Sequence, residues 1–193
     1  MSQAEKIVIT GSPLRWQDVV AVARHGAQLE LSSDTWARIE NAQAIVQRIV
    51  ASGERAYGVN TGLGGLSNVS LQDQQLSQLS RNTLLSHACG VGPVLADEQT
   101  RAIICAAIHN YSHGKSGLHR RVVEGLLALL NRGITPQVPS QGSVGYLTHM
   151  AHIGITLLGV GNVSYRGQII SAQQALAEEG LQPVQLGAKD GLC

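Results

Sequence analysis

The chain of 193 residues carries a formal net charge of +1, with 44% hydrophobic and 14% charged residues. This composition excludes a disordered chain, and the near-neutral balance gives no electrostatic reason to expect a nucleic-acid or anionic-membrane partner. The length suffices for one domain, whose core must be built from Leu, Ile, Val and Ala because aromatic residues make up only 3% of the chain.

The cysteines and the hydropathy pattern indicate a cellular compartment. Cys89, Cys105 and Cys193 are odd in number and lack the spacing of metal ligands. The first two lie in apolar, helix-like stretches, so we expect them to be buried, inert thiols. The chain begins with a polar segment instead of a secretory signal, and no apolar run reaches membrane-spanning length. We therefore expect a cytoplasmic protein.

The first half of the chain predicts one strand and three helices. In chain order these are a strand over residues 6–10, a helix from Leu14 that stops at Gly26, a longer helix capped by Ser33 or Asp34 and ended by Gly53, a glycine-rich loop over residues 57–65, and a helix over residues 71–88.

The second half continues this mainly helical pattern. It predicts a helix that begins at Asp97 and Glu98 and runs past Ile108, a helix over residues 119–131 stopped by Gly133, an extended link between Pro136 and Pro139, an apolar helix over residues 147–158, a hairpin over residues 163–170, and a short helix over residues 172–179 ended by Gly180. The predicted fold is mainly α with short β pieces and one glycine-rich loop.

Two patterns that suggest ligands fail on spacing. Gly62, Gly64 and Gly65 have no following Lys and no surrounding strand–turn–helix unit, so we expect no nucleotide site. His109 and His113 can share a helix face, but no carboxylate or Cys follows in register. Surface or capping roles are predicted for these two residues and for His119, and we expect no metal site.

Two other features carry both a functional and a structural interpretation. Tyr57 opens the loop over residues 57–64, which can present a proton acceptor or can simply form a tight turn against a helix. A tyrosine accepts protons only if its pKa falls well below its ordinary value of about 10. His87 follows Ser86 at a predicted helix end, where its charge suits the helix dipole or its ring can select a polar ligand.

Taken in order, several segments of the chain resemble those of the aromatic amino-acid ammonia-lyases, the superfamily that acts on histidine, phenylalanine and tyrosine. These segments are Tyr57-Gly58-Val59-Asn60-Thr61-Gly62-Leu63-Gly64, Ser86-His87, Val138-Pro139, Gly142-Ser143-Val144-Gly145 and Ala188-Lys189-Asp190-Gly191-Leu192. The resemblance covers nearly the whole chain, but family members are much longer. It implies that residues 1–193 are the N-terminal, electrophile-bearing portion of such a fold, with the helical C-terminal portion absent.

The resemblance also implies a chemistry for particular residues. Tyr57 would be the base, His87, Gly64 and Asn60 would bind substrate, and Gly145 would flank a methylidene-imidazolone electrophile that the family forms from Ala-Ser-Gly. No metal or nucleotide would be needed. Because the Ser-His pair is similar to that of histidine-specific members, the implied reaction is elimination of ammonia from L-histidine to give urocanate. Family members are homotetramers whose active sites combine several subunits.

One departure leaves alternatives open. Gly145 runs directly into Tyr146, so the Ala-Ser-Gly triad is not written in this sequence. Either a modified residue is missing from the sequence, or the triad is truly deleted. A true deletion would leave a non-catalytic lyase-like module that binds amino acids or pairs with other subunits. A tyrosine or phenylalanine ammonia-lyase or an aminomutase also stays open, because Leu63 and Tyr146 are not the usual choices of the family.

Overall fold

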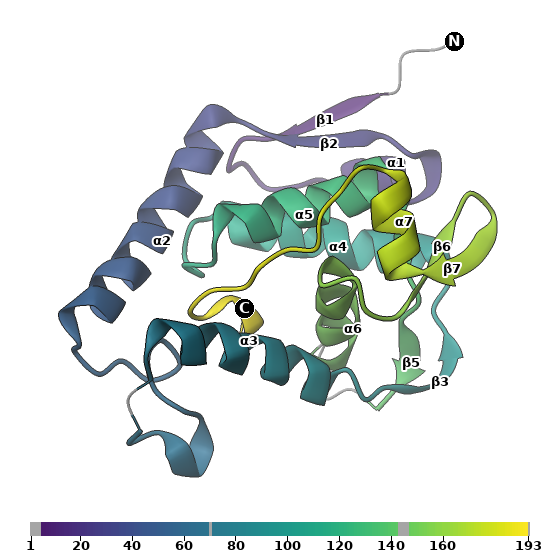
Figure 1. The fold of residues 1–193 in the computed structure, drawn as a ribbon. Helices are drawn as coiled ribbons and strands as arrows, with labels where there is room; N and C mark the ends of the chain where they lie inside the picture. Colours follow the sequence, from purple (N-terminus) through teal and green to yellow (C-terminus); the bar gives the residue numbers. More distant parts are fainter. Residues whose placement is uncertain (1–4, 70, 143–146, 193) are drawn as a thin grey trace.

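A computed structural model of the chain describes residues 5–69, 71–142 and 147–192 (Figure 1). The helices are α1 (Trp16–His25), α2 (Ser33–Ser52), α3 (Asp73–His87), α4 (Asp97–Ser112), α5 (Arg120–Asn131), α6 (Leu147–Leu157) and α7 (Ala172–Glu178). The strands are β1 (Lys6–Ile9), β2 (Gln28–Leu31), β3 (Val91–Val94), β4 (Thr135–Pro136), β5 (Pro139–Gln141), β6 (Asn162–Tyr165) and β7 (Gln168–Ser171). Two short 3-10 turns, η1 (Gly64–Leu66) and η2 (Asp190–Leu192), complete the list. The prediction of a mainly α fold with short β pieces is confirmed.

The core lies around α4 and α5, which run side by side at the centre of the molecule (Figure 1). Their inward stripes are aliphatic, and Ile104, Ile108, Val123 and Leu129 are fully buried. Helix α1 packs on α4, while α6 packs on α5 and on α3. This packing joins α3, which carries His87, to the central pair through α6.

The helix ends follow the expected capping chemistry, with one shift. Ser32, rather than Ser33 or Asp34, is the N-cap of α2, because its Oγ accepts a hydrogen bond from the backbone N–H of Thr35 at 3.3 Å. At the other end Gly53 has the left-handed backbone, with φ of 71°. The prediction that glycines end α1 and α2 is confirmed.

Strands β2 and β3 were not predicted, and β4 and β5 lie where the sequence predicted only an extended link. Strand β2 pairs in parallel with β1, and its four residues alternate between an inner face of Leu29 and Leu31 and an outer polar face. Strand β3 pairs antiparallel with β5, although its residues are exposed and include a glycine and a proline. Strands β2 and β3 have four residues each, which is too few for an alternating hydrophobic pattern to be recognised in the sequence. The predicted hairpin is confirmed by the pairing of β6 with β7.

The end of the chain crosses in front of α5 and reaches α3 (Figure 1). Ser77 Oγ donates to the carbonyl of Leu186 at 2.7 Å, and Ser80 Oγ donates to the carbonyl of Gly187 at 2.8 Å. Gly191 then passes so close to α3 that an added Cβ would lie 2.2 Å from the backbone oxygen of Ser80. Residues 186–192 are therefore packed on α3 through specific backbone contacts.

Candidate active site

The loop that begins at Tyr57 projects a phenol into solvent. The Tyr57 side chain is 68% exposed, and it makes no hydrogen bond to the part of the chain that the structure describes. Directly after it the backbone turns back, with Gly58 at φ of 70° and the amide of Val59 donating to the carbonyl of Ala56 at 3.0 Å. The loop thus presents Tyr57 outward from a fixed turn.

Asn60 holds the shape of this loop. Its Oδ1 accepts from the amide of Ala56 at 2.9 Å, and its Nδ2 donates to the carbonyl of Glu54 at 2.8 Å. The residue is 5% exposed. A contact between Asn60 and substrate stays a prediction, and the bonds seen in the structure give this residue a role in positioning Tyr57.

Leu192 connects the loop to the C-terminal end of α3. A Cβ added at Gly58 would lie 3.4 Å from Leu192 Cδ1, an ordinary van der Waals distance, so the loop and the leucine are direct neighbours. Glycine is favoured at position 58 by its left-handed backbone, with φ of 70°. On its other side Leu192 lines a cavity of about 120 Å³ together with His87 and Leu147. The Tyr57 loop, the chain end and α3 therefore meet at one place.

His87 is oriented by its own helix. Its Nδ1 lies 2.8 Å from the carbonyl of Thr83, and the geometry fits an Nδ1–H that donates to this oxygen. Ser86 Oγ lies 3.1 Å from the same nitrogen. With Nδ1 engaged in this way, Nε2 is left as the hydrogen-bond acceptor that faces outward.

The segment expected to hold the electrophile is flanked by residues of the same site. Gly142 ends the described part of the chain before it, and Leu147, which lines the His87 cavity, begins α6 after it. Gly145 itself lies outside the described residues. Thr148 Oγ1 donates to the carbonyl of Gly142 at 3.4 Å, so the two flanks contact each other.

His152 supports the opposite side of this junction. Its Nε2 accepts a hydrogen bond from the amide of Gly90 at 3.1 Å, which ties α6 to the segment that leaves α3. Burial, with a smaller contribution from nearby His149, lowers the pKa of His152 and favours the neutral ring that this bond requires. This contact gives His152 a structural role at the junction.

Sequence reasoning missed the carboxylate that fixes the chain end. Asp190 has a fully buried side chain, and it accepts from the amides of His119 at 2.8 Å and Gly187 at 2.7 Å. His119 Nδ1 lies 2.9 Å from Asp190 Oδ2 without the alignment of a hydrogen bond, and Arg121 Nη2 lies 3.9 Å away. The segment Ala188–Leu192 resembles the family, but no sequence pattern indicates that Asp190 accepts a hydrogen bond from the distant residue His119.

Other predictions fare differently. Cys105 is buried as expected, but Cys89 is exposed because it lies just beyond the end of α3, so the prediction of a buried thiol is wrong there. His119 does occupy the N-cap position of α5, yet its side chain is only 13% exposed.

Among the described residues there is no group of three His, Cys, Asp or Glu side chains placed to bind a metal ion. Within the same ranges, every helix is too short or too polar to cross a membrane.

Comparison with known proteins assigns the family. The family profile described as aromatic amino acid lyase matches residues 14–193. The chain belongs to this family. A curated histidine ammonia-lyase from Treponema denticola is 42% identical over 193 residues, which cover 98% of this chain and 38% of that protein.

Solved structures of lyase-family members share the fold. An ergothionase from Treponema denticola, an ergothioneine-degrading enzyme in complex with desmethyl-ergothioneine sulfonic acid, superposes with a TM-score of 0.93 at 34% identity. A tyrosine aminomutase from Streptomyces globisporus superposes with a TM-score of 0.90 at 32% identity. Each match covers 97% of the present chain. It covers only 38% of the ergothionase chain and 36% of the aminomutase chain.

Proposed function

We propose that this chain is the N-terminal portion of an aromatic amino-acid ammonia-lyase whose substrate is L-histidine and whose products are urocanate and ammonia. The observation that carries the proposal is the meeting of the Tyr57 loop, Leu192 and the His87 cavity beside the two flanks of residues 143–146. The curated histidine ammonia-lyase at 42% identity supports the choice of substrate.

The proposed roles follow from what each group offers. Tyr57, exposed and without a partner among the described residues, takes the β-proton of the substrate. His87 Nε2 accepts a hydrogen bond from the imidazole N–H of histidine, which distinguishes this substrate from phenylalanine. Gly64 leaves its backbone open to a ligand, because an added Cβ would meet nothing within 4 Å.

The electrophile is the point at which the chain departs from its family. The methylidene-imidazolone ring forms from an Ala-Ser-Gly triad, and this sequence passes from Gly145 to Tyr146 without one. Only four residues, 143–146, separate Gly142 from the start of α6 at Leu147. The residues in this sequence do not fit the ring, so the elimination proposed above holds only if the triad lies between Gly145 and Tyr146.

A second candidate function follows from this departure. Without the triad, the chain binds an aromatic amino acid or pairs with other lyase subunits, and it does not release ammonia. The cavity of about 120 Å³ favours an incomplete site, since ordinary small-molecule pockets measure about 300–1,000 Å³. Further residues, from a longer chain or from another subunit, would be needed to enclose a substrate.

Two finer proposals concern assembly and location. We propose a homotetramer with shared active sites, which is supported by exposed apolar side chains at Val91, Val94 and Leu147 near the site. We propose a cytoplasmic location, which is supported by the free thiols of Cys89 and Cys105.

The first experiment joins mass mapping to ligand binding. Peptide mapping across residues 139–152 establishes whether Gly145 is joined to Tyr146 or to a dehydrated Ala-Ser-Gly group. In parallel, L-histidine is titrated into the ¹⁵N-labelled chain, and we expect saturable amide shifts at Gly58, His87 and Leu192. Urocanate formation is followed by its ultraviolet absorbance, with L-tyrosine, L-phenylalanine and ergothioneine as competing substrates.

Variants separate the two candidates. If the triad is present, Tyr57→Phe lowers turnover by about 10²–10⁴-fold, the usual contribution of a general base. If it is absent, turnover is nil in every variant, and His87→Gln still weakens histidine binding. His25→Gln, at the exposed end of α1, is the matched control and should change neither quantity. Histidine shifts that avoid Gly58, His87 and Leu192 would refute substrate binding at this site under both candidates.

A further inference from the structure

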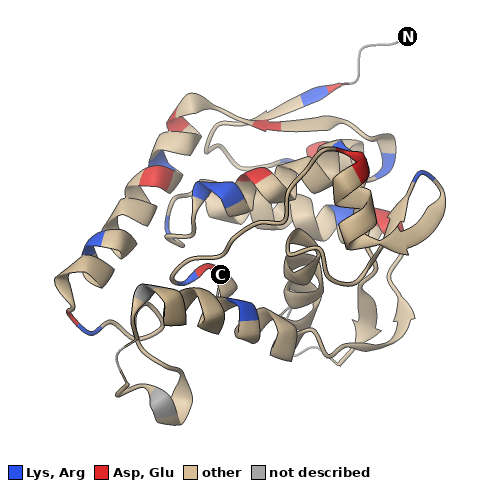
Figure 2. Ribbon diagram, in the orientation of Figure 1, with Lys and Arg blue, Asp and Glu red and all other residues tan. Residues whose placement is uncertain are grey.

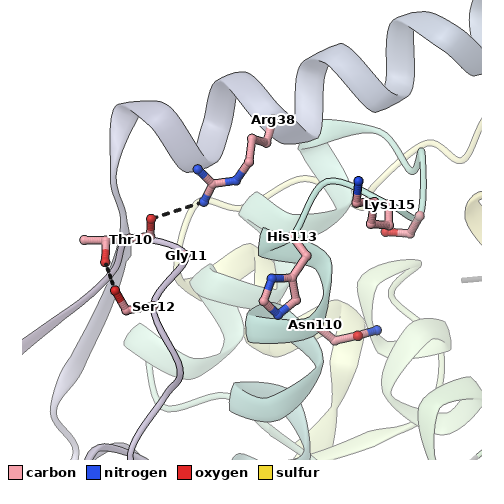
Figure 3. Close-up of a pocket in the computed structure, with 8 residues that line it drawn as sticks. Thr10, Gly11, Ser12, Arg38, Asn110, His113 and Lys115 are labelled. Carbon is pink, nitrogen blue, oxygen red and sulfur yellow. Dashed lines mark hydrogen bonds between the residues drawn. The ribbon is translucent and has the colours of Figure 1, made fainter.

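A second cavity lies away from the His87 site. It has a volume of about 890 Å³ and opens to solvent between α2, the end of α4 and the turn after β1 (Figure 3). The residues that line it are Thr10, Gly11, Ser12, Arg38, Asn110, His113, Lys115 and Ser116. None of these eight residues is acidic, and three of them carry basic groups.

Arg38 gives this cavity a fixed positive charge. Its Nη2 donates to the Thr10 carbonyl at 3.3 Å and to Thr35 Oγ1 at 2.9 Å, and its Nε donates to the Ser112 carbonyl at 3.3 Å. All three acceptors are uncharged, so no carboxylate within the described ranges neutralises the guanidinium. Nη1 makes no hydrogen bond to those ranges and remains available to a ligand.

Two glycines, which lack a Cβ, leave space for Arg38. A Cβ added at Gly11 would lie 2.6 Å from Arg38 Nη2, and one added at Gly114 would lie 2.6 Å from the Arg38 backbone oxygen. Both glycines have positive φ, at 99° and 66°. The guanidinium is therefore held in place before any ligand arrives, which reduces the entropic cost of binding.

Further polar groups approach from other directions. In Figure 3 the Arg38 side chain reaches from α2 toward Thr10, while the ring of His113, the residue that follows α4, lies between the Thr10–Ser12 turn and Lys115. The His113 ring packs edge-on against the ring of His109, with centroids 5.0 Å apart. The Lys115 side chain is exposed and has no ion-pair partner in the described parts of the chain. Figure 2 shows that Lys and Arg are otherwise interspersed with Asp and Glu along α2 and α5, so a cavity that is lined by basic residues without an acidic one is a local feature.

We propose that this cavity binds the phosphate group of a small metabolite. A phosphate presents several acceptor oxygens to the donor side chains of Arg38, His113 and Lys115 that line this cavity, whereas a planar carboxylate suits a single guanidinium. A volume of about 890 Å³ leaves room for the rest of a metabolite beside its phosphate group. The proposal is independent of the proposed lyase function, because the two cavities share no lining residue.

The test is a titration of the ¹⁵N-labelled chain with inorganic phosphate at constant ionic strength. Saturable shifts are expected at the amides of Gly11, Ser12 and Lys115. The exposed Lys115→Gln should weaken phosphate binding about threefold, and Arg38→Gln should weaken it about tenfold or more. Arg48→Gln is the matched control, since this exposed arginine lies on the same helix about 15 Å further along, at 1.5 Å per residue.

The outcomes decide the proposal. If Arg38→Gln does not fold, Lys115→Gln and His113→Asn provide the comparison with Arg48→Gln. Shifts that rise linearly without saturation, or that chloride reproduces, would overturn the site. Saturation by malonate at equal or lower concentration than phosphate would overturn the assignment of a phosphate ligand.

Discussion

The buried carboxylate of Asp190 should be the most sensitive single group in the C-terminal segment. Changing Asp190 to Asn keeps the size of the side chain but turns one acceptor oxygen into a donor. In the native protein one carboxylate oxygen accepts from the amide of His119 at 2.8 Å and the other accepts from the amide of Gly187 at 2.7 Å. The variant therefore loses one of these two hydrogen bonds. A hydrogen bond to a charged acceptor contributes about 1.5–3 kcal/mol, and the orphaned amide is partly buried, so we expect a loss of about 2–3 kcal/mol in the free energy of unfolding.

Thermal unfolding followed by circular dichroism measures this loss. For a chain of this size 1 kcal/mol corresponds to about 2–4 °C, so the Asp190→Asn midpoint should fall by about 4–12 °C. Asp97→Asn is the matched control, because Asp97 is exposed in the first turn of α4, where a charge contributes only about 0.3–1 kcal/mol. If the two variants unfold at similar temperatures, the carboxylate does not fix the chain end and this reasoning is wrong.

Two further predictions use the titrating groups. Burial lowers the pKa of His152 below 6.5, so the unfolded chain binds the proton more readily than the folded chain. The contribution of the neutral His152 ring to stability is therefore complete above about pH 6.5 and is lost as the pH falls through the lowered pKa. His152→Gln keeps an acceptor for the Gly90 amide, and urea unfolding should show a smaller loss of stability on acidification than in the unmodified chain; equal losses would count against the assignment. Burial also raises the pKa of the Cys105 thiol to about 11, so iodoacetamide at about pH 8 should alkylate Cys89 in the native protein and Cys105 only after unfolding, as judged by peptide mapping. Equal rates at the two thiols would contradict the burial of Cys105.

Local signals predicted most of the helices. Glycines at positions 26 and 53 end helices because the left-handed backbone costs them little, and this information is local to the sequence. Strand β2 could not be predicted in the same way, since four residues carry too little periodicity and its pairing partner β1 lies across α1. Cys89 was misjudged for a similar reason, because burial beyond a helix end depends on what packs there.

The candidate site was only partly accessible from the sequence. The residues Tyr57 and His87 were predicted from their motifs, but the residue that brings them together, Leu192, has no local signal. Its position depends on Asp190, which bonds to the amide of a residue 71 positions away. Chemistry of this kind can be found only when long-range contacts are known.

The contacts of the chain end have a consequence for the order of folding. Ser77 and Ser80 on α3 find their acceptors at Leu186 and Gly187, more than a hundred residues later. During synthesis, α1 to α5 can therefore assemble while the inner face of α3 still lacks its partner. Because closing so long a loop is slow, docking of residues 186–192 on α3 should follow the assembly of α1 to α5. A nascent chain would acquire the wall between the Tyr57 loop and His87 only after Leu192 has left the ribosome.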